Sequence, residues 1–154
     1  MRKQVSILCL LTVLLISLSG CIVYDTTYPL LHSADKIETI EIYLLEAAKG
    51  EIPEEAIPVA YVDSADYSDF CSDLEDLPFR NGIMLLPVAF DPGWYLDGYV
   101  VKIIYDTGGF DIIAGSGYQY QQEADGSRFR GRHYSVEDDS MWNSFIEKYI
   151  NISF

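Results

Sequence analysis

Three arginines alternate along one segment of the chain, at Arg128, Arg130 and Arg132. Residues two apart in a β-strand share a face, so this spacing predicts a row of guanidinium groups. Such a row is suited to an anionic ligand or to the acidic tail of a partner protein, because guanidinium groups bind carboxylates in a bidentate geometry. The same arginines could instead neutralise acidic neighbours or protect a sheet edge, and the sequence leaves both interpretations open.

A second group of candidate binding residues lies in segment 90–99, which contains Pro and Gly and is predicted to be a long connection. The group comprises Asp91, Trp94, Tyr95 and Asp97. A sugar or a peptide could stack on the aromatic rings while the carboxylates accept hydrogen bonds. The alternative is that Trp94 closes one end of the core, since tryptophan is mostly buried in folded proteins.

Signals for catalysis are weak. Asp106-Thr107-Gly108 is the tripeptide of aspartic proteases, but Gly109 follows where Ala or Ser is expected, and a hairpin turn explains the same residues. Cys71 shares a helical face with apolar residues, which predicts a buried thiol. The sequence contains no serine-hydrolase elbow, Walker loop, zinc-protease helix or Cys-x-x-Cys pair. We therefore expect no catalytic residue, no metal and no cofactor.

The amino-terminus has the pattern of an export signal. Arg2 and Lys3 precede an apolar stretch that is too short for a stable membrane span. Segment 18–21, Leu-Ser-Gly-Cys, resembles the lipobox of bacterial lipoproteins, in which the cysteine is acylated and becomes the mature amino-terminus. This resemblance implies a signal peptide over 1–20, acyl chains such as palmitate on Cys21, and anchoring to the extracytoplasmic face of the cell membrane or envelope.

The remaining chain is strongly acidic. Removal of the signal with Arg2 and Lys3 leaves eight basic and 24 acidic residues, a formal charge of −16. Such a charge disfavours electrostatic binding to nucleic acid. Residues 21–35 show no clear periodicity and are predicted to form a tether, and residues 36–154 are long enough for one small domain.

Hydrophobic periodicity predicts an α+β domain, with two helices packed on one face of a curved, hairpin-rich antiparallel sheet of about 5–7 strands. The expected elements are strands over 36–44, 56–62 and 83–88, a helix from Ser64 to Leu77, hairpins over 99–115 and 117–136, and a helix from about residue 137.

The turns set the expected register of each hairpin. A tip at Thr107-Gly108 predicts the pairs Tyr105–Phe110, Ile103–Ile112 and Val101–Ala114. A type I′ turn at Asp125-Gly126 predicts Glu123–Arg128, Gln121–Arg130 and Gln119–Arg132, with Gly131 across from Tyr120.

The whole chain is similar to small bacterial lipoproteins that have no assigned activity, through Ile40-Glu41-Ile42, the Tyr105–Gly108 hairpin and the Phe145–Tyr149 helix. We expect a non-enzymatic binding or interaction module, anchored to the membrane through Cys21. Its partner would be another protein or a small ligand. The alternatives are an inhibitor or immunity-type protein that blocks a basic secreted enzyme and, with less support, a small hydrolase.

Overall fold

The structure is a computed structural model, and it describes residues 22–49, 51–83, 95–115, 118–126, 129–136 and 138–150. Its eight strands are β1 (Ile22–Thr26), β2 (Ile37–Lys49), β3 (Ala60–Tyr61), β4 (Phe79–Ile83), β5 (Tyr95–Tyr105), β6 (Phe110–Ala114), β7 (Tyr118–Gln122) and β8 (Phe129–Val136). The α-helices are α2 (Tyr67–Asp76) and α3 (Asp139–Ile150), and the short 3₁₀ helices are η1 (Ala34–Lys36) and η2 (Ser64–Asp66).

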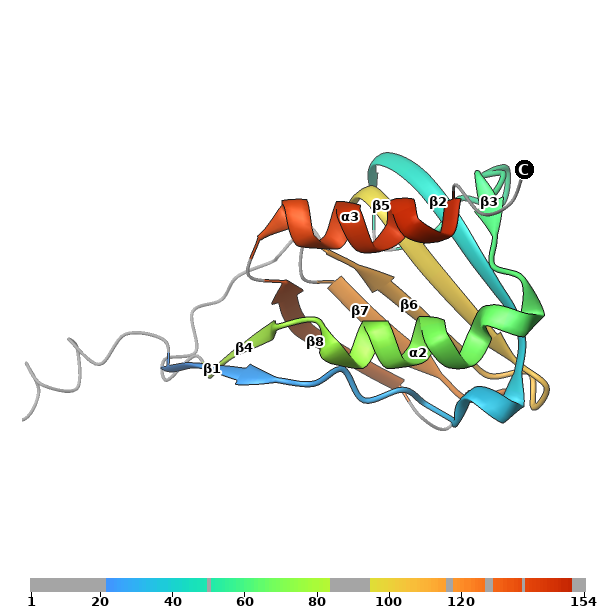
Figure 1. The fold of residues 1–154 in the computed structure, drawn as a ribbon, viewed down its shortest axis with the longest axis horizontal. Coiled ribbons are helices and arrows are strands. Elements are labelled where there is room, and N and C mark those ends of the chain that lie inside the picture. Colours follow the sequence, from blue (N-terminus) through green and yellow to red (C-terminus); the bar gives the residue numbers. More distant parts are fainter. Residues whose placement is uncertain are drawn as a thin grey trace, which may run out of the picture.

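All described strands belong to one open antiparallel sheet in the order β1-β4-β8-β7-β6-β5-β2-β3. Both α-helices lie on the same face of this sheet (Figure 1). Their buried side chains share one core cluster with β2, β5 and β6. The predicted α+β class, with two helices on one face of an antiparallel sheet, is confirmed.

Strand β1 lies within residues 21–35, which the sequence predicts to form a tether. It pairs with β4 over its whole length, from Ile22 opposite Ile83 to Thr26 opposite Phe79. Immediately after β1, Tyr28 is 2% exposed and its ring lies 5.7 Å from that of Phe79. The described chain is therefore part of the folded domain from its first residue onward.

The predicted register of the first hairpin is wrong by one residue. Ile103 lies opposite Asp111 and Val101 opposite Ile113. The Gly108 amide donates to the Tyr105 carbonyl at 2.8 Å, and Gly108 takes a positive φ of 84°. The turn thus has three residues and a glycine bulge rather than two residues, and the extra residue shifts every following pair.

The predicted register of the second hairpin is confirmed where the structure describes it. Gln121 lies opposite Arg130, Gln119 opposite Arg132, and Tyr120 opposite Gly131. The turn type is different, because the Gly126 amide donates to the Glu123 carbonyl and only Gly126 in this turn has a positive φ. The described pairs nevertheless keep the register that a two-residue type I′ turn would give.

The helices bury the faces that their spacing predicts. Phe70, Cys71 and Leu74 are buried in α2, as are Trp142, Phe145, Ile146 and Tyr149 in α3. The helical segment begins at Ser64, as predicted, with the short helix η2, and the Asp63 carboxylate caps η2 by accepting from the Ala65 amide at 2.9 Å. Segment 84–94, which contains most of the predicted 83–88 strand, lies outside the described residues.

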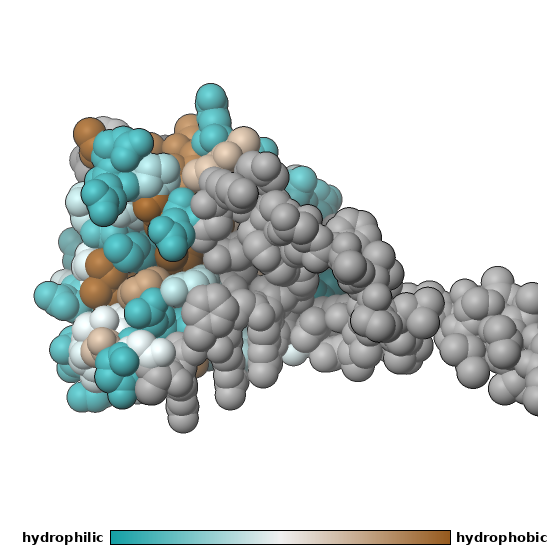
Figure 2. Space-filling view, turned by 180° about the vertical axis from the view of Figure 1, so that it is seen from behind, coloured by the Kyte–Doolittle hydropathy of each residue, from teal (hydrophilic) through white to brown (hydrophobic). Residues whose placement is uncertain are grey.

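The sheet face opposite the helices carries a second, smaller apolar cluster, formed by side chains of β2, β5 and β6. Ile52 and Ala56 from the loop after β2 pack against it. Figure 2 shows this open face, where hydrophobic side chains lie among hydrophilic ones. The loop covers only part of the face, and this leaves room for a surface pocket.

Candidate functional site

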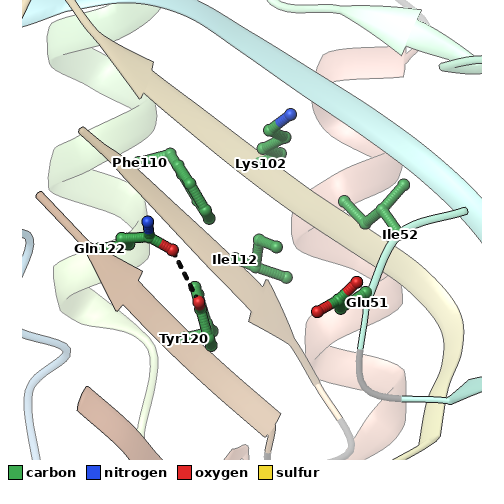
Figure 3. A pocket seen from close by; sticks show the side chains of 7 residues that line it. All are labelled: Glu51, Ile52, Lys102, Phe110, Ile112, Tyr120 and Gln122. Carbon is green, nitrogen blue, oxygen red and sulfur yellow. Dashed lines mark hydrogen bonds between the residues drawn. The ribbon is translucent and has the colours of Figure 1, made fainter. Parts of the chain in front are cut away.

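A pocket of about 270 Å³ lies on the open face of the sheet, between the loop after β2 and strands β5 to β7 (Figure 3). We call it the open-face pocket. It is lined by Glu51, Ile52, Lys102, Phe110, Ile112, Tyr120 and Gln122. Alternation along β5, β6 and β7 brings these strand residues to one face, since opposite residues in an antiparallel pair point the same way.

An aromatic pair forms one wall of this pocket. The rings of Phe110 and Tyr120 stack with an interplanar angle of 16° and a centroid separation of 5.6 Å. The Tyr120 hydroxyl donates a 2.7 Å hydrogen bond to Oε1 of Gln122, which fixes the outer end of the ring (Figure 3). Tyr120 also lies opposite Gly131, which has no side chain to compete for the space beside it. The wall is thus preorganised for contact with an apolar or flat group.

Two charges of opposite sign stand at the pocket. Nζ of Lys102 lies 5.7 Å from the centre of the Phe110 ring, a cation–π contact. Glu51 is exposed and lies on another side of the pocket, with Ile112 between the two in Figure 3. Within the described residues, neither Lys102 nor Glu51 forms an ion pair. Both charges therefore remain available to a bound molecule.

A buried polar cluster lies on the other side of the sheet, beneath the chain segment 29–32, which we call the strap. Asp111 is fully buried, and its Oδ2 accepts hydrogen bonds from the Tyr105 hydroxyl at 2.6 Å and from the Leu31 amide at 3.0 Å. Its Oδ1 accepts none from any described residue. Burial raises the pKa of Asp111 above its ordinary value, and those two hydrogen bonds act in the opposite direction.

Two further contacts hold the strap to the sheet. Nε2 of Gln121 donates to the Pro29 carbonyl at 2.7 Å. Nε2 of His32 lies 3.1 Å from Oε2 of Glu123, and the His32 ring meets the Tyr105 ring edge to face at 4.9 Å. Because Asp111 and Tyr105 have no solvent exposure, this cluster is built to position the strap rather than to contact a substrate.

An open groove of about 610 Å³ runs between segment 27–34 and helix α2. Cys71 contributes to its wall, and burial raises the pKa of the Cys71 thiol to about 11. The thiol is therefore protonated at neutral pH. Cys71 is buried, as its predicted helical face indicates.

The described part of the predicted binding loop, residues 95–99, belongs to strand β5. Asp97 and Tyr95, expected in a connection, belong to this strand. Oδ1 of Asp97 accepts a 3.1 Å hydrogen bond from the amide of Ala47, a residue with positive φ at a bulge in β2. Asp97 thus stabilises an irregular backbone. Asp91 and Trp94 lie outside the described residues.

The described part of the arginine row has the predicted register. Arg130 and Arg132 lie opposite Gln121 and Gln119 in the backbone ladder, and Arg128 lies outside the described residues. Gln121 in turn lies opposite the buried Asp111. The two arginine positions therefore alternate with Gly131, the residue opposite Tyr120, and belong to the other face of the sheet from the open-face pocket.

Sequence reasoning missed the open-face pocket. Its residues are spread over β5, β6, β7 and a loop, and the wrong register of the first hairpin hid their proximity. The useful signal was Lys102, a single cation inside an otherwise apolar strand segment. In the correct register Lys102 lies opposite Ile112, which is itself opposite Tyr120.

Comparisons with known proteins give no relative for this chain: no family model, no curated protein and no solved structure matches it. Among the described residues, no helix has the length and apolar character needed to cross a membrane. The described residues also include no group of three or more His, Cys, Asp or Glu side chains that could hold a metal ion.

Proposed function

We propose that this protein is a lipid-anchored binding protein on the extracytoplasmic face of the bacterial cell envelope, and that it holds a small ligand in the open-face pocket without transforming it. The lipobox residues and the basic, apolar segment before Cys21 support the anchor. The pocket supports the binding role. It combines the stacked Phe110–Tyr120 pair with two charges that no described side chain neutralises.

Several side chains whose pKa values are strongly shifted have surroundings that favour a structural role over catalysis. Asp111 and Tyr105 are buried beneath the strap, and Cys71 is a protonated thiol at neutral pH. Asp106, in the protease-like tripeptide, lies in a hairpin turn with its carboxylate 3.7 Å from Nζ of Lys36. Aspartic proteases require two carboxylates that share a proton. The group that lies beside Asp106 is instead the ammonium of Lys36.

The inhibitor or immunity role is a second candidate, favoured by the outer surface of α2. Asp69, Glu75 and Asp76 are exposed there, within a chain whose formal charge is −14. A basic enzyme would be attracted to such a surface. If this role is correct, the full chain captures one basic secreted protein, and modest salt releases it.

The anchor is tested by feeding the expressing bacterium an alkyne analogue of palmitate. The wild-type chain is expected to carry the label and to sediment with membranes, whereas a Cys21→Ala variant is expected to carry none. An unlabelled wild-type chain would contradict the lipoprotein assignment.

The binding role is tested by thermal unfolding of the full chain in detergent against a panel of monosaccharides, amino acids and nucleosides. A ligand at 100 times its Kd should raise the Tm by about 5 °C or more. Tyr120→Ala should remove this rise, and Tyr61→Ala should preserve it, because Tyr61 is an exposed tyrosine on edge strand β3 outside the pocket. An equal rise in both variants would place the binding site elsewhere.

A further inference from the structure

The two charges of the open-face pocket are separated by apolar surface. Ile112 is 7% exposed and forms the floor, with Lys102 on one side and Glu51 on another (Figure 3). Ile52 adds an aliphatic wall beside Glu51. The arrangement therefore offers a cation, an anion and an apolar surface to one molecule at the same time.

A free amino acid presents the complementary set of groups. Its carboxylate matches the Lys102 ammonium, its own ammonium matches the Glu51 carboxylate, and an apolar side chain matches Ile112 and the Phe110–Tyr120 wall. A ligand with only one charge would leave either Lys102 or Glu51 without a counter-charge in the complex.

The size of the pocket limits the ligand. Its volume of about 270 Å³ lies just below the range of about 300–1,000 Å³ that is typical of small-molecule sites. An oligosaccharide or a long peptide would extend well beyond the lined region. A single amino acid is a ligand of suitable size.

The net charge of the protein also favours a zwitterionic ligand. With a formal net charge of −14, the chain repels anionic molecules at long range. A zwitterion has no net charge, so it approaches the pocket without this repulsion and still offers a carboxylate to Lys102 at short range. An anion with the same carboxylate would be disfavoured.

We propose that the open-face pocket binds the zwitterionic form of a free amino acid with an apolar side chain. The proposal rests on the proposed function, because it names the ligand class of the same pocket. Lys102 binds the carboxylate, Glu51 binds the ammonium, and the aromatic wall contacts the side chain.

The test uses the full chain in detergent and measures Kd by calorimetry for L-leucine, leucinamide and N-acetyl-leucine. The amide lacks the carboxylate and the acetylated form lacks the ammonium. We expect each analogue to bind more weakly than L-leucine, by up to about fivefold, as the loss of one charge pair near a surface implies.

Paired variants assign each charge. Lys102→Gln should weaken the binding of L-leucine and leave the Kd of leucinamide unchanged. Glu51→Gln should weaken the binding of L-leucine and leave the Kd of N-acetyl-leucine unchanged. Lys36→Gln and Glu54→Gln are matched controls, since both residues are exposed and lie outside the pocket lining. The controls are expected to bind L-leucine like the wild type.

The outcomes separate this proposal from the proposed function. If a sugar or nucleoside binds in a Tyr120-dependent way and L-leucine does not, the ligand class is overturned and the binding role stands. If L-leucine binds equally to all variants, the assignment to Lys102 and Glu51 is overturned. If no member of the panel binds, both proposals fail.

Discussion

The Tyr105 hydroxyl and the Asp111 carboxylate form a 2.6 Å hydrogen bond across the β5–β6 hairpin, and neither residue is exposed to solvent. The same carboxylate oxygen accepts from the Leu31 amide in the strap, 80 positions earlier in the chain. One buried acid therefore fixes both the position of the strap and the packing beneath it.

Asp111→Asn is expected to change how stability depends on pH. Because burial raises the folded-state pKa of Asp111, the folded chain binds the proton more tightly than the unfolded chain does. The wild type therefore loses stability as pH rises from the ordinary carboxyl pKa of about 4 through the folded value. The neutral amide has no such loss, so the Tm of the variant should increase relative to that of the wild type as pH rises. Parallel pH profiles would contradict this.

Tyr105→Phe separates the hydrogen bond from the burial of the acid. The variant loses a hydrogen bond to a carboxyl group, which costs about 1.5–3 kcal/mol when the acceptor is charged. The loss should be larger at neutral pH than in mild acid, because this bond favours the ionised form of Asp111. Urea unfolding at two pH values measures it, and an equal loss at both would contradict a change in the ionisation of Asp111 between them.

Gly115→Ala is expected to destabilise the packing between the sheet and α3. A Cβ at this position would lie 2.4 Å from two ring carbons of Trp142, whose Nε1 donates to the Tyr99 carbonyl at 2.9 Å. We expect a loss of about 1–3 kcal/mol or more, with a change in tryptophan fluorescence.

Gly126→Ala is the matched control for Gly115→Ala. A Cβ at Gly126 meets only Nε2 of Gln122, at 4.0 Å, so its positive φ of 73° is the main cost, about 1–2 kcal/mol. This variant should lose stability without a change in the environment of Trp142. A similar fluorescence change in both variants would contradict the packing explanation.

The double variant Arg130→Glu/Arg132→Glu tests the arginine row against the pocket. By register these positions alternate with Gly131, which lies opposite Tyr120, so they belong to the face away from the pocket. We expect small-ligand binding to be unchanged, as measured by calorimetry. A loss of ligand binding with an unchanged Tm would instead show that the arginine row takes part in binding.

The sequence was sufficient for the fold class because the helical faces and the Asp-Gly hairpin are local patterns. Phe70, Cys71 and Leu74 recur at helical spacing in α2 and are all buried. The register of the first hairpin was not predictable from apolar pairing alone, since Thr107-Gly108 fits a two-residue turn as well as the three-residue turn that forms. That one-residue difference decides whether Asp111 belongs to the buried face.

The candidate site depended on this register and on tertiary packing. Two-residue alternation indicates that Lys102 shares a face with Val100, but it does not indicate that Tyr120 and the loop at Glu51 lie nearby. Likewise, the strap has no periodicity, because single contacts from Asp111, Gln121 and Glu123 hold it rather than a regular ladder.

The most direct test of the central claim is nuclear magnetic resonance of the full ¹⁵N-labelled chain in detergent, titrated separately with L-leucine and with D-glucose. Binding in the open-face pocket predicts that the amide signals of Lys102, Ile112 and Tyr120 shift most with whichever compound binds. The largest shifts in segment 27–34 and helix α2, or no shift with either compound, would contradict the claim.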